Sequence, residues 1–369
     1  MASQSGKDVK GPLAGLRVIE FAGIGPGPHC AMLFADMGAD VLRVERAGGN
    51  GWPNPIVDRG RASKALDIRT GEGRDWCREA AMHADVVIEG FRPGVMERLG
   101  LGPDHLCRAN PRLVYGRMTG WGQEGPLARV AGHDINYIGL VGALAAMGRP
   151  GEAAPVPLNL VGDFGGGSMY LAFGILAALW ERERSGLGQV IDAAIIDGVA
   201  SMMTMFTGLT ATGQLSLARE RNLLGGAAPF YRSYLCADGR EIAVGSIEPQ
   251  FFSILLERLG LEEFAGCQHD VDRWNDLACR FAHVFLQADR DHWAALFADS
   301  DACVSPVLTA DEALVHPHHA ARGTFTDRDA LLQAAPAPRL SRTPGSIQRR
   351  RDADAMAADW AAAGGAGGE

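Results

Sequence analysis

The segment from Ala131 to Tyr137 brings a histidine, His133, to the start of an expected helix. An imidazole titrates near neutral pH, and the first free backbone N–H groups of a helix attract anions. A base at His133 and an N–H donor for a developing negative charge at Asp134 would therefore lie one residue apart. A polar helix start with an N-cap near Asp134 is the simpler interpretation, and it stays open.

A second candidate is Asp163, which precedes three consecutive glycines, Gly165 to Gly167, and an apolar helical stretch. Glycines leave space for a ligand, and apolar neighbours such as Phe164 favour a raised carboxyl pKa. The alternative makes Asp163 an N-cap and the glycines a place of close backbone packing, and the two interpretations are compatible. Glu248 precedes Pro249 and another expected helix, where the residues alone predict only an acidic cap.

The glycine-rich turn from Gly23 to Gly27 follows an expected strand, and Glu45 ends the next strand, as in a dinucleotide-binding fingerprint. The third glycine of that fingerprint is missing, because its position holds Pro28 or Cys30 depending on where the count starts. Proline also stiffens the turn. We expect a rigid entry into the first helix and not an NAD site.

The elements that must position these residues alternate between short β-branched runs and longer helical patterns in the first half of the chain. This rhythm predicts an α/β fold with a mostly parallel sheet, followed by a smaller α+β domain with a hairpin at Asp238-Gly239. Expected strands are Leu16 to Phe21, Ala39 to Val44, Lys64 to Asp67, Ala84 to Glu89, Leu113 to Met118 and Gln189 to Ala194. Expected helices include Ile135 to Met147, Ser168 to Glu183, Asp197 to Thr212, Gln250 to Leu259 and Arg273 to Ala288.

The expected domain limits follow from that rhythm. Residues 1–195 form the first part of a large domain, 196–225 a linker helix and 226–320 the small domain. Residues 321–369 return to the large domain and end in a Gly/Ala tail that we expect to be frayed from Ala361.

Composition limits the possible functions. The 369 residues carry a formal net charge of −9, which disfavours nucleic acid as a partner and requires local cations for any anionic ligand. Seven cysteines without a CxxC pair suggest neither a disulfide framework nor a zinc site, and the histidines at 316, 318 and 319 suggest a polar turn. Without a signal peptide or a sufficiently long apolar stretch, we expect no membrane contact and a cytoplasmic location.

Several blocks of sequence resemble the family III CoA-transferase superfamily, and within it the α-methylacyl-CoA racemase group. They include EFAGIGPGPHCAM, FRPGVMERLGLGP, RMTGWGQEGP, AGHDINY, PLNLVGDFGGG and AVGSIEPQF, in this order between Gly15 and about Thr343. The resemblance implies a large nucleotide-binding-like domain and a small domain in an interlocked homodimer. It implies racemisation of 2-methylacyl-CoA thioesters through an enolate, with no cofactor beyond the coenzyme A of the substrate.

The same resemblance assigns roles to individual residues. His133 and Asp163 are the two acid/base residues, and Glu248 of the second subunit hydrogen-bonds His133, while the Asp134 N–H helps to stabilise the enolate. The coenzyme A contacts carried over are Arg46, Leu66, Asp67, Ile68, Arg69, Arg98, Gly132, His133, Asp134, Ile135, Asn136 and Tyr137.

Gly225 and Ala227 depart from the pattern of the relatives, where aspartate and glycine are usual, and leave the acyl chain open. The same fold admits a CoA-transferase that uses Asp163 as a nucleophile, and a catalytically silent CoA-binding protein.

Overall fold

The computed structural model describes residues 11–49 and 52–365. Residues 1–10, 50–51 and 366–369, which include the outermost parts of both predicted chain ends, lie outside it. The chain divides into two compact units. The first combines residues 1–141, 157–202 and 322–369, and the second combines residues 142–156 and 203–321. Residues 142–156, which the sequence-based division gave to the large domain, thus cluster with the second unit.

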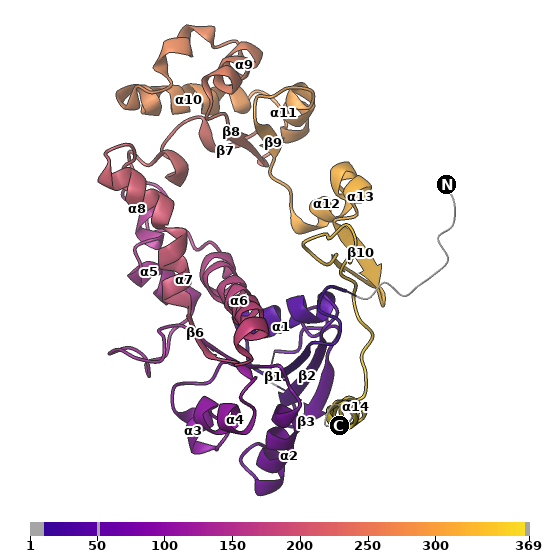
Figure 1. The fold of residues 1–369 in the computed structure, drawn as a ribbon. Helices are drawn as coiled ribbons and strands as arrows, with labels where there is room; N and C mark the ends of the chain where they lie inside the picture. Colours follow the sequence, from indigo (N-terminus) through magenta and orange to yellow (C-terminus); the bar gives the residue numbers. More distant parts are fainter. Residues whose placement is uncertain (1–10, 50–51, 366–369) are drawn as a thin grey trace. The chain divides into compact units, whose positions relative to one another are not determined.

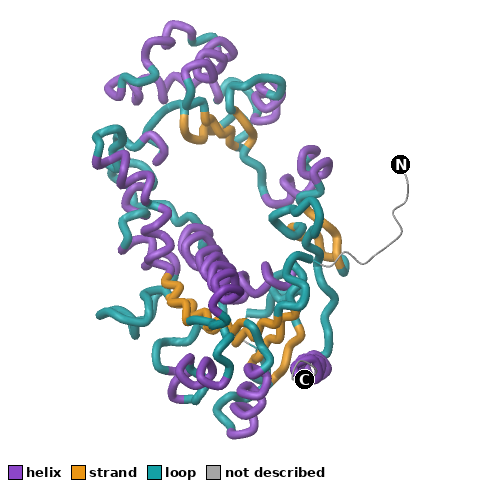
Figure 2. Tube along the Cα trace, in the orientation of Figure 1, coloured by secondary structure: helices purple, strands orange, loops and turns teal. Residues whose placement is uncertain are grey.

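A six-stranded, wholly parallel sheet forms the centre of the first unit (Figures 1 and 2). Its strands are β1 (Arg17–Phe21), β2 (Asp40–Glu45), β3 (Ala62–Ala65), β4 (Val86–Glu89), β5 (Val114–Thr119) and β6 (Val190–Ala194). The strand order is β3-β2-β1-β4-β5-β6. The α/β prediction is confirmed, and the order reverses direction between β1 and β4, where open sheets of this kind bind their ligands.

Helices cover both faces of this sheet (Figure 1). On one face, α1 contacts β1 and β2, and α6 contacts β5 and β6; on the other, α4 contacts β5, and α14 contacts β2 and β3. The central strands β1, β2, β4 and β5 are consequently buried on both sides, whereas the edge strands β3 and β6 are partly exposed. The helices of this unit are α1 (Pro26–Asp36), α2 (Gly71–Met82), α3 (Val95–Arg98), α4 (Pro103–Ala109), α5 (Asp134–Leu140), α6 (Tyr170–Ser185), α7 (Ile195–Met202) and α14 (Ala353–Gly365).

A ten-residue π-helix, η2 (Leu160–Met169), leads directly into α6. The helix therefore begins before the expected Ser168, and the alternative interpretation of Asp163 as an N-cap is wrong, because Asp163 lies in the first turn of η2. The glycines explain the wider coil: a Cβ on Gly198 of α7 would lie 1.9 Å from the Gly166 carbonyl oxygen. Only two glycines permit this approach of η2 and α7.

Three further differences concern chain ends and breaks. The expected helix from Asp197 to Thr212 is two helices, α7 and α8 (Thr204–Ala211), interrupted at Met203. The expected helix from Ile135 ends as α5 at Leu140, because Gly142 adopts a φ of 87°. The tail is not frayed from Ala361, because α14 anchors itself through the buried residues Met356 and Trp360 and continues to Gly365.

The second unit contains an antiparallel sheet of β7 (Tyr231–Leu235), β8 (Glu241–Gly245) and β9 (Val304–Pro306). The hairpin predicted at Asp238-Gly239 is confirmed, with Gly239 at a φ of 74°. Its helices are α8, α9 (Pro249–Leu259), α10 (Trp274–Phe285), α11 (Arg290–Phe297), α12 (Ala310–Val315) and α13 (Pro317–Arg322). Aromatic side chains such as Phe230, Phe252 and Trp274 fill its core.

The remaining elements are short. A hairpin of β10 (Phe325–Arg328) and β11 (Leu331–Ala334) belongs to the first unit. It is tied there by Arg59, which donates to Gln333 Oε1 at 2.7 Å and pairs with the buried Asp36. Single 3₁₀ turns occupy Leu144–Ala146, Leu223–Gly225, Glu262–Cys267 and Val271–Arg273.

Candidate active site

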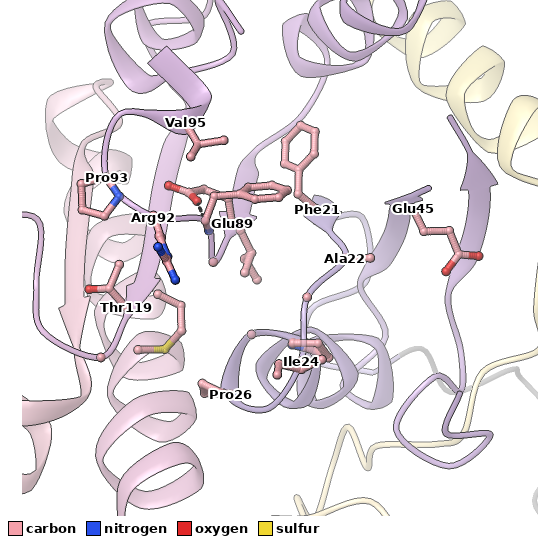
Figure 3. Close-up of a pocket in the computed structure, with 18 of the residues that line it drawn as sticks. Phe21, Ala22, Ile24, Pro26, Glu45, Glu89, Arg92, Pro93, Val95 and Thr119 are labelled. Carbon is pink, nitrogen blue, oxygen red and sulfur yellow. Dashed lines mark hydrogen bonds between the residues drawn. The ribbon is translucent and has the colours of Figure 1, made fainter. Parts of the chain in front are cut away.

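A cleft of about 970 Å³ opens at the carboxyl ends of the parallel strands in the first unit. Its walls come from the loops that follow β1, β2, β3, β4 and β5, and from the segments around His133 and Asp163. Figure 3 shows part of this lining, with Ile24 and Pro26 at the start of α1 facing Arg92 and Thr119. The position is the topological switch point of the sheet, where a ligand is expected in this class of fold.

Asp163 projects into the cleft from the first turn of η2. Burial raises the pKa of its carboxyl group; a hydrogen bond from Asn159 lowers it, the nearby Asp134 raises it, and the charge of His133 lowers it again. The Asn159 Nδ2 group donates to Asp163 Oδ2 at 3.1 Å. The charge of His133 lowers the pKa of Asp163, and both residues line the cleft. The structure therefore brings together the two residues that the sequence singled out.

Asp134 has a structural task that the sequence did not predict. Its buried side chain accepts the backbone N–H of Asp163 at 2.7 Å, which ties η2 to the start of α5. A Cβ on Gly162 would lie 2.4 Å from Asp134 Oδ2, so glycine is needed beside the carboxylate. The N-cap of α5 is His133, and the helix begins at Asp134, one residue before the expected start at Ile135.

His133 is exposed, and its backbone N–H donates to Asn136 Oδ1 at 3.0 Å. The loop before it is shaped by Tyr137, whose hydroxyl donates to the Gly132 carbonyl and whose ring meets Trp121 edge-on at 4.7 Å. A Cβ on Gly132 would lie 2.8 Å from the Tyr137 ring. These contacts fix the direction in which the chain enters α5 and thereby the position of His133.

The residues proposed to contact coenzyme A divide into two groups. Arg46, Leu66, Asp67, Ile68, Arg69, Gly132, His133 and Tyr137 line the cleft, whereas Arg98, Asp134, Ile135 and Asn136 do not. Arg69 forms two hydrogen bonds of 2.9 Å with Asp67, which lower the pKa of that carboxyl group to about 2. Arg46 donates to the Gly49 carbonyl at 2.8 Å. The ends of β2 and β3 therefore offer cations at the surface of the cleft.

Glu89 is a cleft residue that sequence reasoning missed. It ends β4, accepts the Phe91 N–H at 2.7 Å and Arg117 Nε at 3.0 Å, and is 1% exposed. Burial raises its pKa to about 6 despite these partners. The only signal in the sequence was an acidic residue at a strand end, and the register that places Arg117 opposite Glu89 is visible only in the sheet.

The glycine turn after β1 does not complete a dinucleotide fingerprint. Gly25, at a φ of 70°, is the N-cap of α1, and Pro26 is its first residue. A Cβ on Gly25 would lie 3.0 Å from Asp163 Oδ2, so the turn brings backbone close to the candidate carboxylate. The close approach of the turn to Asp163 explains why position 25 is a glycine.

Glu248 belongs to the second unit, where it is the N-cap of α9 before Pro249. In the same unit, a Cβ on Gly225 would lie 2.6 Å from Asn222 Nδ2 and 2.7 Å from the Ala146 carbonyl oxygen. The departure at position 225 therefore leaves no room for a side chain in this conformation. Ala227 packs against the aromatic core of the unit.

Comparisons with known proteins agree on one family. A family model described as CoA-transferase family III matches residues 13–353. Alpha-methylacyl-CoA racemases of Mus musculus and Homo sapiens are 46% and 44% identical to this chain, each over 92% of the chain and 89% of the relative. The crystal structure of a CAIB/BAIF family protein from Brucella suis has a TM-score of 0.81 and 28% identity, and covers 96% of this chain and 99% of its own.

Proposed function

The chain belongs to the CoA-transferase family III, and on this premise we propose that it is an α-methylacyl-CoA racemase, an isomerase of 2-methylacyl-CoA thioesters. Identities of 44–46% to racemases over nearly the whole chain support the activity. The observation that carries the proposal is the meeting of Asp163 and His133 in one cleft. A buried carboxyl group with a raised pKa and an exposed imidazole provide two different bases for one carbon atom.

The reaction inverts C2 of the acyl group. A base removes the weakly acidic proton next to the thioester, and the resulting planar enolate is reprotonated on its other face. Inversion therefore requires one base on each face. His133 acts on the S thioester and Asp163 on the R thioester, and each residue returns the proton in the opposite direction.

The raised pKa of Asp163 suits both of its tasks. A carboxyl group whose pKa lies nearer to the working pH is a stronger base when ionised and still gives up its proton readily. The hydrogen bond from Asn159 favours the ionised form of the carboxyl group. The Asp134 N–H at the start of α5 contributes to stabilisation of the enolate oxygen. This chemistry needs no metal or redox cofactor.

Coenzyme A is bound along the carboxyl ends of the strands. Arg46 and Arg69 line the cleft and supply the local cations that a chain with a net charge of −9 must provide for phosphate groups. Leu66 to Ile68 and Gly132 to Tyr137 complete the contacts carried over from the family. Arg98 is exposed on α3 outside the cleft lining and has the weakest support.

A homodimer accounts for the unusual surface of α6. Met169, Phe173, Leu176 and Trp180 recur at helical spacing and are 52%, 72%, 44% and 71% exposed. By length and composition, the stretch Leu160–Ser185 is the one described helix able to cross a membrane. Because the stretch also carries Asp163, we assign its apolar face to a second copy of the chain. In that interlocked dimer, Glu248 comes from the other subunit and orients His133.

We place the enzyme in the cytoplasm, since its cysteines, from Cys30 to Cys303, are all free.

The proposed function is tested by supplying each enantiomer of a 2-methylacyl-CoA in deuterated water. Deuterium should enter C2 and both enantiomers should appear from either starting material. A panel of sterol, branched-chain and aryl acyl groups would identify the preferred chain. Absence of both exchange and inversion across the panel would overturn the proposal.

A CoA-transferase is the second candidate, because relatives with that activity in their names share the fold. One is the succinyl-CoA–D-citramalate CoA-transferase of Chloroflexus aurantiacus, 32% identical over 91% of this chain and 89% of its own. There, Asp163 would attack the thioester carbonyl and form a mixed anhydride while CoA leaves as the thiolate. A free carboxylic acid added to the assay separates the two. Transfer of CoA to that acid without C2 exchange would favour the transferase.

A further inference from the structure

The run from Gly165 to Gly167 follows Asp163 almost directly and has no side chains with which to hold itself. A Cβ on Gly166 would lie 2.6 Å from Val199, and one on Gly167 would lie 3.0 Å from Pro26, so glycine is needed for close packing on both sides. A π-helix of this length is also uncommon, because most π-helical segments are single turns. The direction of the Asp163 carboxylate must therefore be fixed from outside η2.

His29, in the first turn of α1, touches the residues on either side of that glycine run. Its Nδ1 atom is hydrogen-bonded to Ser168 Oγ at 2.7 Å. Its ring lies 4.8 Å, centroid to centroid, from the ring of Phe164. Ser168 is fully buried and His29 is half-buried, so the protein shields this hydrogen bond in part from water. One side chain thus spans the most deformable part of the helix that carries Asp163.

The surroundings of His29 suit a supporting residue. Burial lowers the pKa of the His29 imidazole, and the charge of Arg59 lowers it further, so both favour the neutral ring. A neutral ring adds no second cation near Asp163. Gly25, the N-cap of the same helix, has its backbone against the Asp163 carboxylate, so the start of α1 meets this segment at two places.

We propose that His29 is a positioning residue, which braces the glycine run between Phe164 and Ser168 and so fixes the Asp163 carboxylate for proton transfer. His29 lies behind the wall of the cleft and contacts no reacting atom. The inference rests on the proposed function, because it treats Asp163 as the base for one of two enantiomers. It predicts an effect on one face of the enolate only.

Two variants remove the same hydrogen bond from opposite ends. His29→Phe keeps a ring against Phe164, and Ser168→Ala removes the hydroxyl with little change of volume. Each should lower kcat for C2 exchange from the R thioester on the order of 10- to 100-fold, the cost of a misplaced reacting group, with KM unchanged. Exchange from the S thioester should stay within about twofold of wild type. The double variant should be no worse than either single variant.

The control is His105→Phe, the same substitution at an exposed position in α4. It should leave both rates unchanged. An equal fall from both enantiomers in the His29→Phe protein would mean a general structural role, and unchanged rates would mean no role; either result overturns the inference. Additive losses in the double variant would also contradict a shared hydrogen bond.

A second measurement keeps the inference testable if the proposed function fails. Amide hydrogen exchange over residues 160–169 should be faster in His29→Phe than in wild type, while residues 195–202 of α7 keep their protection. Unchanged exchange in η2 would overturn the brace by itself. Absence of C2 exchange from wild type would instead overturn the proposed function, and the amide result would still decide whether His29 holds the segment.

Discussion

Asp163 and His133 line the same cleft, but the segments that carry them are built differently. Asp163 is half-buried in η2, where Asn159, Asp134 and Gly25 contact it from three sides. His133 is exposed at the first cap of α5, a helix of only seven residues. Contacts within its own unit thus hold Asp163 in place, whereas His133 lies at the surface of that unit.

The two candidate bases are therefore oriented in different ways. Burial and fixed neighbours set the pKa of Asp163 before any ligand binds. His133 has an exposed ring, and in the proposed dimer it is completed by Glu248 of the second subunit. Substitution of the neighbours of Asp163 should therefore affect exchange from the R thioester selectively, and disruption of the dimer should affect exchange from the S thioester.

The largest expected effects come from removing each base. His133→Ala should abolish C2 exchange that starts from the S thioester, and Asp163→Ala should abolish exchange from the R thioester. Racemisation should fall about 10²- to 10⁴-fold in either variant, the usual contribution of a general base. Deuterium incorporation and chiral analysis of each enantiomer measure both quantities.

Residual exchange with retention on the untouched face is the internal control, because the remaining base can remove and return a proton on its own side. Racemisation of both enantiomers at the wild-type rate in His133→Ala would contradict the assignment of His133 as one of the two bases. The histidine would then be only a helix cap.

A steric substitution tests whether η2 depends on its close packing. The Cβ of Gly198→Ala would lie 1.9 Å from the Gly166 carbonyl oxygen, and because both groups are backbone neither can move away cheaply. The free energy of unfolding should fall by about 2–4 kcal/mol. Denaturant titration measures it.

The matched control is Gly208→Ala in α8, where nothing lies within 4 Å of the new Cβ. It should stabilise by roughly 0.5–1 kcal/mol, because alanine loses less backbone entropy in a helix. Equal behaviour of the two variants would show that η2 and α7 do not need their glycines.

Glu248→Gln sharpens the view of His133 as a base completed from outside. The substitution keeps the shape and removes the charge that steadies the imidazolium, so exchange from the S thioester should fall by about tenfold, less than in His133→Ala. Exchange from the R thioester should change less. A loss equal to that of His133→Ala would mean that Glu248 does more than orient the ring.

Sedimentation should show a dimer, and a fully active monomer would contradict the assignment of Glu248 to the second subunit.

The smallest effect concerns pH. Asn159→Ala removes the hydrogen bond that favours the ionised form of Asp163, so the pKa of that carboxyl group should rise. Asp163 removes a proton only when ionised. The acidic limb of kcat from the R thioester should therefore move to higher pH by the same amount, whereas the profile from the S thioester stays in place. An equal shift of the pH profiles from both thioesters would contradict the prediction that the two bases titrate separately.

The sequence predicted the parallel strands from short apolar runs, which are buried on both faces in β1, β2, β4 and β5, and the six expected strands of the sheet lie within a few residues of the observed ones. It also brought His133 and Asp163 forward as chemical groups. The π-helix was not predictable, because a repeat of i→i+5 leaves no periodicity of its own over Leu160 to Met169, and the packing of Gly166 on Gly198 depends on two distant segments.

Glu89 and Asp134 show the same limit. The raised pKa of Glu89 results from burial beneath the cleft, and the hydrogen bond from the Asp163 N–H to Asp134 joins residues 29 positions apart in sequence. Neither burial nor a long-range partner can be read from a local pattern. The contacts that tune the site were therefore not predictable, whereas the cleft residues His133 and Asp163 stood out in the sequence.

The position of α14 has a consequence for synthesis of the protein. Met356 and Trp360 complete the core beside β2 and β3, yet more than two hundred residues, including the whole second unit, are translated between those strands and this helix. A nascent chain that has left the ribosome through β6 therefore still exposes the apolar face that α14 later covers. During that interval, the incomplete sheet is a binding surface for chaperones and a site of aggregation.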